Sequence, residues 1–178
     1  MSPPEQIQTG VPIMDRFFGG LERALTRVNS FFVLIASLML IGLMITVNVD
    51  LFLRFFFRSP IMGMTEVTEL FLLYITFLGT GWVYRDDGHV VVDVLLYNLY
   101  AGSKKALLLQ NHIIVGLISF ILVYYGLLTT WDHFMRGARN PTILETPIAL
   151  ATAVIPIGGA VLLLEVILKI WKLLGKEE

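Results

Sequence analysis

Four long apolar stretches dominate the pattern of hydrophobic and polar positions along the chain. They cover residues 30–53, 66–84, 106–131 and 147–170. A bilayer core about 30 Å thick needs roughly 20 apolar residues in a helix that rises about 1.5 Å per residue. Because backbone polar groups in lipid must be paired within their own segment, each stretch is predicted to form a helix. The expected fold is an all-α integral membrane protein with four transmembrane helices in a single membrane domain, residues 1–178.

Two shorter segments are predicted to lie in the plane of the membrane. In residues 12–28, apolar positions recur every three or four residues and the opposite face is polar and basic. This pattern is typical of an amphipathic helix at the cytoplasmic interface, with phospholipids as its neighbours. Residues 88–101 are too short to span and rich in Val, Leu and Tyr. A second in-plane helix is expected there, and a short buried hairpin is the alternative.

The distribution of charged residues predicts how the chain is oriented in the membrane. The chain is 56% hydrophobic and 15% charged with a net charge of −1 and no cysteine, which argues against a nucleic-acid partner and excludes disulfides and thiolate metal sites. Nine basic residues flank one side of the predicted spans, namely Arg16, Arg23, Arg27, Arg85, Lys104, Lys105, Lys169, Lys172 and Lys176. The other side has four, Arg54, Arg58, Arg136 and Arg139. The excess predicts that both termini and the loop between the second and third spans are cytoplasmic.

Charged residues near membrane depth are functional candidates because their burial in lipid is costly. Asp50 and Arg54 are four residues apart and are expected to pair on one helix face. Glu165 is expected to pair in the same way with Lys169.

Two glutamates open the second apolar stretch. Glu66 suits a helix N-terminus, where exposed amides favour a negative charge. Glu69 lies deeper, so an arginine or amide partner is expected for it.

Small residues in the predicted spans mark places where helices can approach closely. They are Gly79 and Gly81 in the second span, and Gly158 and Gly159 beside Pro156 in the fourth.

The three histidines do not form an expected metal or haem site. His112 and His133 lie at opposite ends of the third span, and His89 lies in a loop. No nucleotide-binding, nucleophile or zinc motif is present. We therefore expect no cofactor and no enzyme activity. Asp93 follows His89 by four residues, so the two can share a helix face.

The stretch from Asp50 to Leu96 resembles the DctQ-type small membrane subunit of tripartite ATP-independent periplasmic (TRAP) transporters. The matching positions are Arg54, Pro60, Glu66, Glu69, Leu78-Gly79, Arg85, Gly88-His89 and Val92-Asp93. The family often has adjacent acidic residues on the second helix, whereas Val67 and Thr68 separate the two glutamates here.

The resemblance implies a non-catalytic scaffold. Its partners would be a large membrane subunit that imports an organic acid with sodium, and a periplasmic substrate-binding protein. The acid would be of the dicarboxylate, keto acid or sialic acid class. The alternatives are a self-sufficient small ion-coupled transporter or channel, with Asp50, Glu69 and Glu165 as an ion path, and a membrane-anchored redox subunit.

Overall fold

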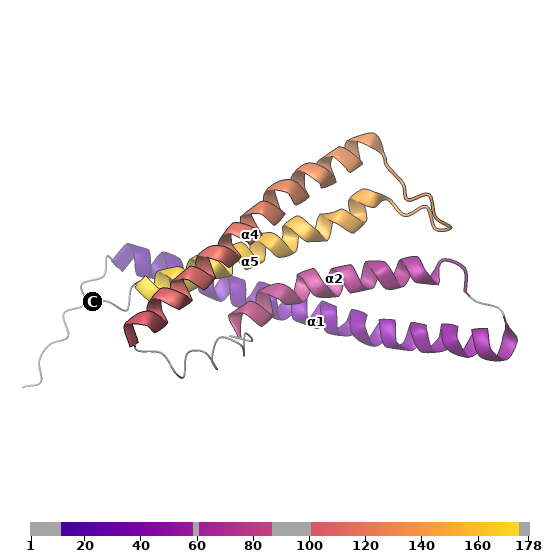
Figure 1. The fold of residues 1–178 in the computed structure, drawn as a ribbon, viewed down its shortest axis with the longest axis horizontal. Coiled ribbons are helices and arrows are strands. Elements are labelled where there is room, and N and C mark those ends of the chain that lie inside the picture. Colours follow the sequence, from indigo (N-terminus) through magenta and orange to yellow (C-terminus); the bar gives the residue numbers. More distant parts are fainter. Residues whose placement is uncertain (1–11, 59–60, 87–100, 175–178) are drawn as a thin grey trace, which may run out of the picture.

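The computed structural model describes residues 12–58, 61–86 and 101–174, and their side chains over 19–58, 61–86 and 107–173. These residues form four helices, α1 (Pro12–Phe57), α2 (Met64–Arg85), α4 (Ala101–Arg136) and α5 (Ile148–Leu174) (Figure 1). Within the described ranges, the β pairing is limited to an isolated bridge between Arg139 and Pro147. The predicted all-α fold is confirmed.

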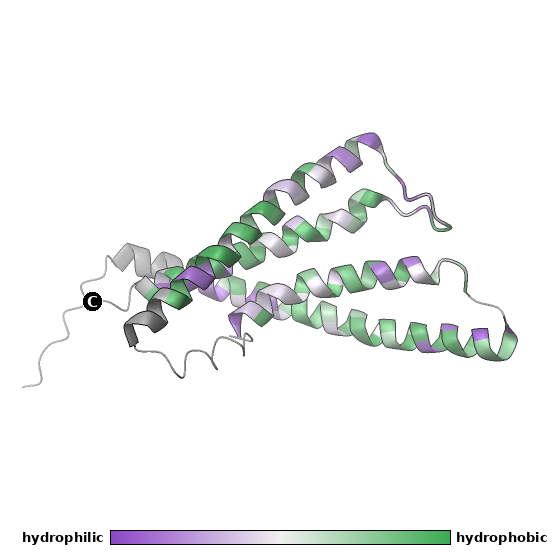
Figure 2. Cartoon of the chain, in the orientation of Figure 1, coloured by the Kyte–Doolittle hydropathy of each residue, from purple (hydrophilic) through white to green (hydrophobic). Residues whose placement is uncertain are grey.

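All four helices are long and apolar enough to cross a membrane. The candidate spans are Gly19–Phe57, Met64–Arg85, Leu107–Arg136 and Ile148–Leu173. Hydrophobic residues cover the middle of the helices, and hydrophilic residues gather toward their ends (Figure 2). Many large apolar side chains are exposed, among them Leu34, Met44, Leu117 and Leu127. Exposed apolar surface on this scale is what a chain surrounded by lipid or by another membrane protein would present.

One helix replaces the two segments predicted at the start of the chain. The structure continues α1 without a break from Pro12 to Phe57, so the expected boundary near residue 29 is not a helix end. No proline lies between Pro12 and Pro60 to interrupt the backbone ladder. The in-plane placement of residues 12–28 stays a prediction. The other in-plane segment, 88–101, lies outside the described residues except for Ala101.

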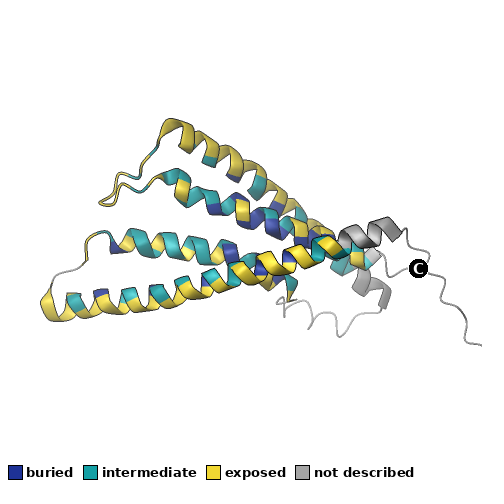
Figure 3. Ribbon diagram, turned by 180° about the vertical axis from the view of Figure 1, so that it is seen from behind, coloured by how far each residue is buried: buried dark blue, intermediate teal, exposed yellow. Residues whose placement is uncertain are grey.

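Helix α5 packs against the three other helices. The more extensive contacts join α1 to α2, α2 to α5 and α4 to α5, and a smaller contact joins α1 directly to α5. The pair α1–α2 and the pair α4–α5 diverge toward the loops that connect the members of each pair (Figure 1). Helix α5 has more buried positions than its neighbours (Figure 3), including Val154, Leu162, Val166 and Leu168. It is the central element of the chain.

Small residues let α5 approach both of its neighbours. A Cβ atom at Gly158 would lie 2.5 Å from the backbone oxygen of Phe77 in α2, and one at Gly159 would lie 3.2 Å from Cγ2 of Val123 in α4. Close approach at these two glycines and at Gly81 is confirmed. At Gly79 nothing lies within 4 Å of a Cβ built there, so no other helix of the described chain approaches it closely, and the prediction for Gly79 stays a prediction.

Candidate functional site

A network of polar side chains joins three helices at one end of the molecule, called here the Arg85 end. Glu165 in α5 is 3% exposed, and its Oε1 accepts a 2.6 Å hydrogen bond from Nδ2 of Asn29 in α1. Asn29 is itself 1% exposed. A buried carboxylate is costly unless it is paired and hydrogen-bonded. The bond to Asn29 therefore both satisfies Glu165 and fixes α1 against α5.

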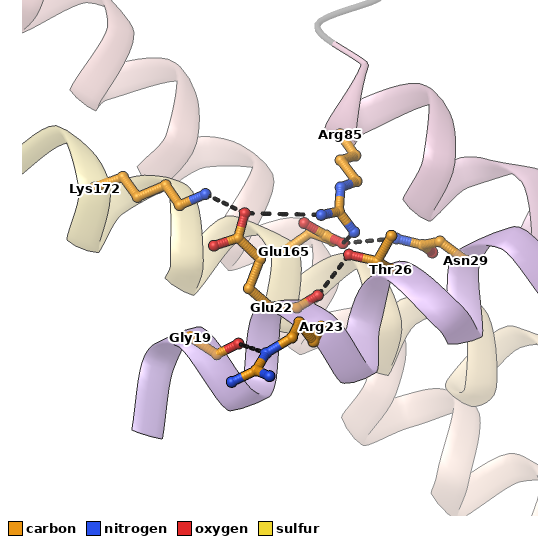
Figure 4. A network of polar contacts seen from close by, with 8 residues as sticks. All are labelled: Gly19, Glu22, Arg23, Thr26, Asn29, Arg85, Glu165 and Lys172. Atoms are coloured by element: carbon orange, nitrogen blue, oxygen red, sulfur yellow. Dashed lines mark hydrogen bonds and ion pairs between the residues drawn. The ribbon is translucent and has the colours of Figure 1, made fainter. Parts of the chain in front are cut away.

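Charged partners surround this bond (Figure 4). Nη1 of Arg85, in the last turn of α2, lies 3.5 Å from Oε1 of Glu165. Nη2 of the same side chain lies 3.8 Å from Oε1 of Glu22, which also accepts a 2.5 Å hydrogen bond from Nζ of Lys172. The two carboxylates are thus paired with Arg85 and Lys172, and the charge of Lys169 also acts on Glu165. This pairing favours a structural role over ion binding.

Lys169, which was predicted to pair with Glu165, acts on it electrostatically but makes its hydrogen bond elsewhere. Nζ of Lys169 donates a 2.7 Å hydrogen bond to the backbone oxygen of Tyr84 and lies 4.9 Å from the centre of the Tyr84 ring. The last carbonyls of a helix lack partners within it, and a lysine side chain can supply one. Lys169 therefore caps the C-terminus of α2 from α5, and Glu165 takes Asn29 and Arg85 instead.

A tyrosine and a histidine link α2 to α4 beside this network. The hydroxyl of Tyr84 lies 2.6 Å from Nδ1 of His112, and both side chains are buried. Their rings meet edge to face with centroids 5.9 Å apart. His112 is thus engaged by Tyr84, whereas His133 lies in the last turn of α4 at the far end of that helix. His89 and Asp93 fall outside the described residues.

The opposite end of the molecule, called here the Asp50 end, contains the predicted pair of Asp50 and Arg54. Oδ2 of Asp50 accepts a 2.7 Å hydrogen bond from Nη2 of Arg54, which confirms the pair. Oδ1 of Asp50 also accepts a 3.0 Å hydrogen bond from the amide of Ile61. The carboxylate therefore joins the end of α1 to the loop before α2, which sequence spacing did not indicate.

Glu66 and Glu69 have different surroundings although both lie near the start of α2. Glu66 accepts hydrogen bonds from the amide of Leu144 (3.4 Å) and the hydroxyl of Thr146 (3.2 Å), so it joins α2 to the loop between α4 and α5. Glu69 is exposed and makes no hydrogen bond or ion pair with any residue that the structure describes. The arginine or amide partner predicted for it is not found within this part of the chain.

An apolar groove of about 760 Å³ lies between α1, α2 and α4. It is lined by Val33, Ala36, Ser37, Leu40, Ile75, Thr76, Gly79, Thr80, Trp82, Val83, Tyr84, Val115, Ile118 and Leu162. Its hydroxyls are those of Ser37, Thr76, Thr80 and Tyr84, and it has no charged lining residue. A groove of this kind suits hydrophobic chains or side chains better than a charged solute.

Sequence reasoning missed the members of the site that lie far apart along the chain. Asn29 stands alone as an amide at the start of a long apolar run, which is the one local signal that could have found it. Its partner Glu165 lies 136 residues away in the sequence. The described residues contain no group of three or more histidine, cysteine, aspartate or glutamate side chains that could hold a metal ion.

Comparison with known proteins finds a matching family and a related membrane protein. The family model described as "Tripartite ATP-independent periplasmic transporters, DctQ component" matches residues 42–176. The chain is also 27% identical, over 105 residues, to the ectoine TRAP transporter small permease protein TeaB of Halomonas elongata. The aligned residues are 59% of this chain and 54% of that relative, so the match spans about half of the relative's length. The chain therefore belongs to the DctQ component family of tripartite ATP-independent periplasmic transporters.

Proposed function

We propose that this chain is the small membrane subunit of a TRAP transporter and acts as a scaffold for a large membrane subunit that carries the solute. The observation that supports this most is where the charges lie. Asp50 pairs with Arg54 at one end, and Glu165 pairs with Asn29 and Arg85 at the other. A carrier needs polar groups that converge near the middle of the membrane, commonly on interrupted helices. Each described helix here is continuous.

The alternative of a self-sufficient ion-coupled transporter gains nothing from this geometry. Asp50 and Glu165 lie at opposite ends of the molecule, and the groove between α1, α2 and α4 has no charged lining residue. For the redox alternative, the buried His112 is held by Tyr84 and His133 lies at the other end of the same helix. Neither alternative has a specific observation in its favour.

The further partners and the substrate follow from family membership and from the resemblance. They are a periplasmic substrate-binding protein, an organic acid as solute and sodium as coupling ion. The similar small permease protein of Halomonas elongata is named for another solute, ectoine, so the organic-acid class rests on the resemblance alone. We place the protein in the bacterial inner membrane, with phospholipids around the basic start of α1.

The scaffold function predicts a stable complex. When this chain is produced with an affinity tag together with the large TRAP membrane subunit of its own organism, both should purify together in mild detergent at a fixed ratio. The control is the same purification with an unrelated four-helix membrane protein that carries the tag. Recovery of this chain without the large subunit, from membranes that contain both, would contradict the proposal.

We further propose that both termini face the cytoplasm, and labelling can test this. The chain has no cysteine, so single sites can be introduced at Ser2, Ser103 and Thr142. Because the excess of basic residues lies on the side of the termini, an impermeant thiol reagent added to intact cells should label Thr142→Cys alone. All three sites should react after the cells are opened, which is the control. Labelling of Ser2→Cys in intact cells would overturn the orientation.

A further inference from the structure

One face of α2 is left without a partner from the part of the chain that the structure describes. Its positions recur every three or four residues along the helix, at Thr65, Glu69, Leu72, Thr76, Gly79, Thr80 and Val83. Of these, Gly79 and Thr80 are partly buried and the others are exposed. The remaining faces of α2 pack against α1 and α5. These seven residues are called the α2 stripe.

Glu69 is the charged residue of the stripe. It precedes Arg85 by sixteen residues, which is about 24 Å along the helix axis and within a membrane core of about 30 Å that begins near Arg85. A carboxylate in that position is costly unless it meets a donor. Every other described acid in the spans has a hydrogen-bond partner within the chain, namely Glu22, Asp50, Glu66, Asp132 and Glu165. Glu69 therefore needs a hydrogen-bond donor from outside the described residues.

The rest of the stripe is shaped for contact with a helix. Oγ1 of Thr76 donates to the backbone oxygen of Leu72 (2.7 Å), and Oγ1 of Thr80 donates to that of Thr76 (2.6 Å), so both hydroxyls are satisfied within α2. Gly79 has open space where a side chain would be. Thr76, Gly79 and Thr80 also line the apolar groove. Small residues at this spacing let a second membrane helix approach closely.

From these contacts, and resting on the proposed scaffold function, we infer that the α2 stripe binds a transmembrane helix of the large subunit. That helix presents a basic or amide side chain to Glu69 and packs on Gly79, which follows Glu69 by ten positions, or about 15 Å along α2.

Charge favours this partner over two other possible occupants of the α2 stripe, which are lipid and a second copy of this chain. Lipid acyl chains could fill the groove, but they have no donor for Glu69. A second copy of the chain in the same membrane orientation, related by a twofold axis along the stripe, would bring one Glu69 toward the other. Like charges that face each other across an interface are repulsive. A different membrane protein with a complementary donor fits best.

Photo-crosslinking tests the surface directly. A photoreactive amino acid is placed at Leu72 or Thr76 in the α2 stripe, and each variant is produced together with the large subunit. The control carries the same amino acid at Thr129, on the exposed face of α4. The stripe positions should yield an adduct with the mass of both subunits, and Thr129 should not. A dimer of this chain, lipid adducts alone, or equal crosslinking from Thr129 would overturn the α2 stripe as the docking surface.

Substitutions provide the second arm of the test. Glu69→Gln should lower the recovered large subunit about tenfold, a loss that corresponds to about 1.4 kcal/mol. Thr76→Trp should lower it further by filling the groove. The matched controls, Asp132→Asn and Thr129→Trp on α4, should leave recovery unchanged. Chain yield and melting temperature should stay at wild-type values in all four variants, because each position is exposed.

Full recovery with both stripe variants would overturn the inference while leaving the scaffold function standing. If the wild-type chain recovers no large subunit at all, the scaffold function itself fails, so the two failures can be told apart.

Discussion

Replacing Gly158 with alanine should destabilise the isolated chain more than any other single methyl group added to its helices. The new Cβ would lie 2.5 Å from the backbone oxygen of Phe77 and 2.9 Å from its Cβ, and a backbone atom cannot move aside as a flexible side chain can. Helices α2 and α5 would have to separate. Overpacking of this kind costs about 2 kcal/mol, which corresponds to a melting temperature lower by roughly 5 °C.

The measurement is thermal unfolding in detergent, followed by the fluorescence of the three tryptophans. Gly79→Ala is the matched control, because Gly79 lies in α2 with open space around the added methyl group. That variant should melt at or slightly above the wild-type temperature, since alanine is the better helix former. Equal melting temperatures for Gly158→Ala and Gly79→Ala would show that the close approach of α2 and α5 does not limit stability.

Replacing Arg85 with methionine should also destabilise the chain, by about 2 kcal/mol, because Glu165 then loses its cationic partner while it stays buried. The effect is smaller than for a fully buried pair, since the Arg85 side chain is 27% exposed. The double variant Arg85→Met with Glu165→Gln should recover most of the loss, because no buried carboxylate is left alone and the amide oxygen at position 165 can still accept from Asn29. Melting temperature in detergent measures both.

The control for these single and double variants is the exposed pair of Arg136 and Asp132 at the far end of α4. Their side chains are 73% and 49% exposed, and exposed pairs contribute at most about 1 kcal/mol. Arg136→Met should therefore change the melting temperature little. If Arg85→Met had no more effect than Arg136→Met, or if the double variant were less stable than Arg85→Met alone, Glu165 would not be held by Arg85.

Local spacing predicted those features of the site that depend on one helix alone. Asp50 and Arg54 pair because residues four apart share a helix face. The four spans followed from runs of apolar residues that need no knowledge of packing. The pattern does not predict the continuity of α1, because the change from amphipathic to apolar positions at residue 29 looks like a helix boundary, although no residue there breaks a helix.

Contacts between helices could not be predicted in the same way. Lys169 is one turn from Glu165, yet it bonds to Tyr84 because the folded chain brings the C-terminus of α2 to it. Gly79 and Gly81 are two residues apart and point to different sides of α2, so only packing decides which of them meets α5. Asn29 and His112 gained their roles from partners on other helices.

Uptake by liposomes tests the scaffold role most directly. Three preparations are compared under the same sodium gradient and with the same periplasmic binding protein: this chain alone, the large subunit alone, and the two together. The scaffold role predicts no uptake by this chain alone and full uptake by the pair. Asp50→Asn and Glu165→Gln should lower the amount of assembled complex and leave the sodium dependence of the remaining uptake unchanged. Substrate uptake by this chain alone, or a variant that assembles normally and couples a different number of ions, would contradict the account.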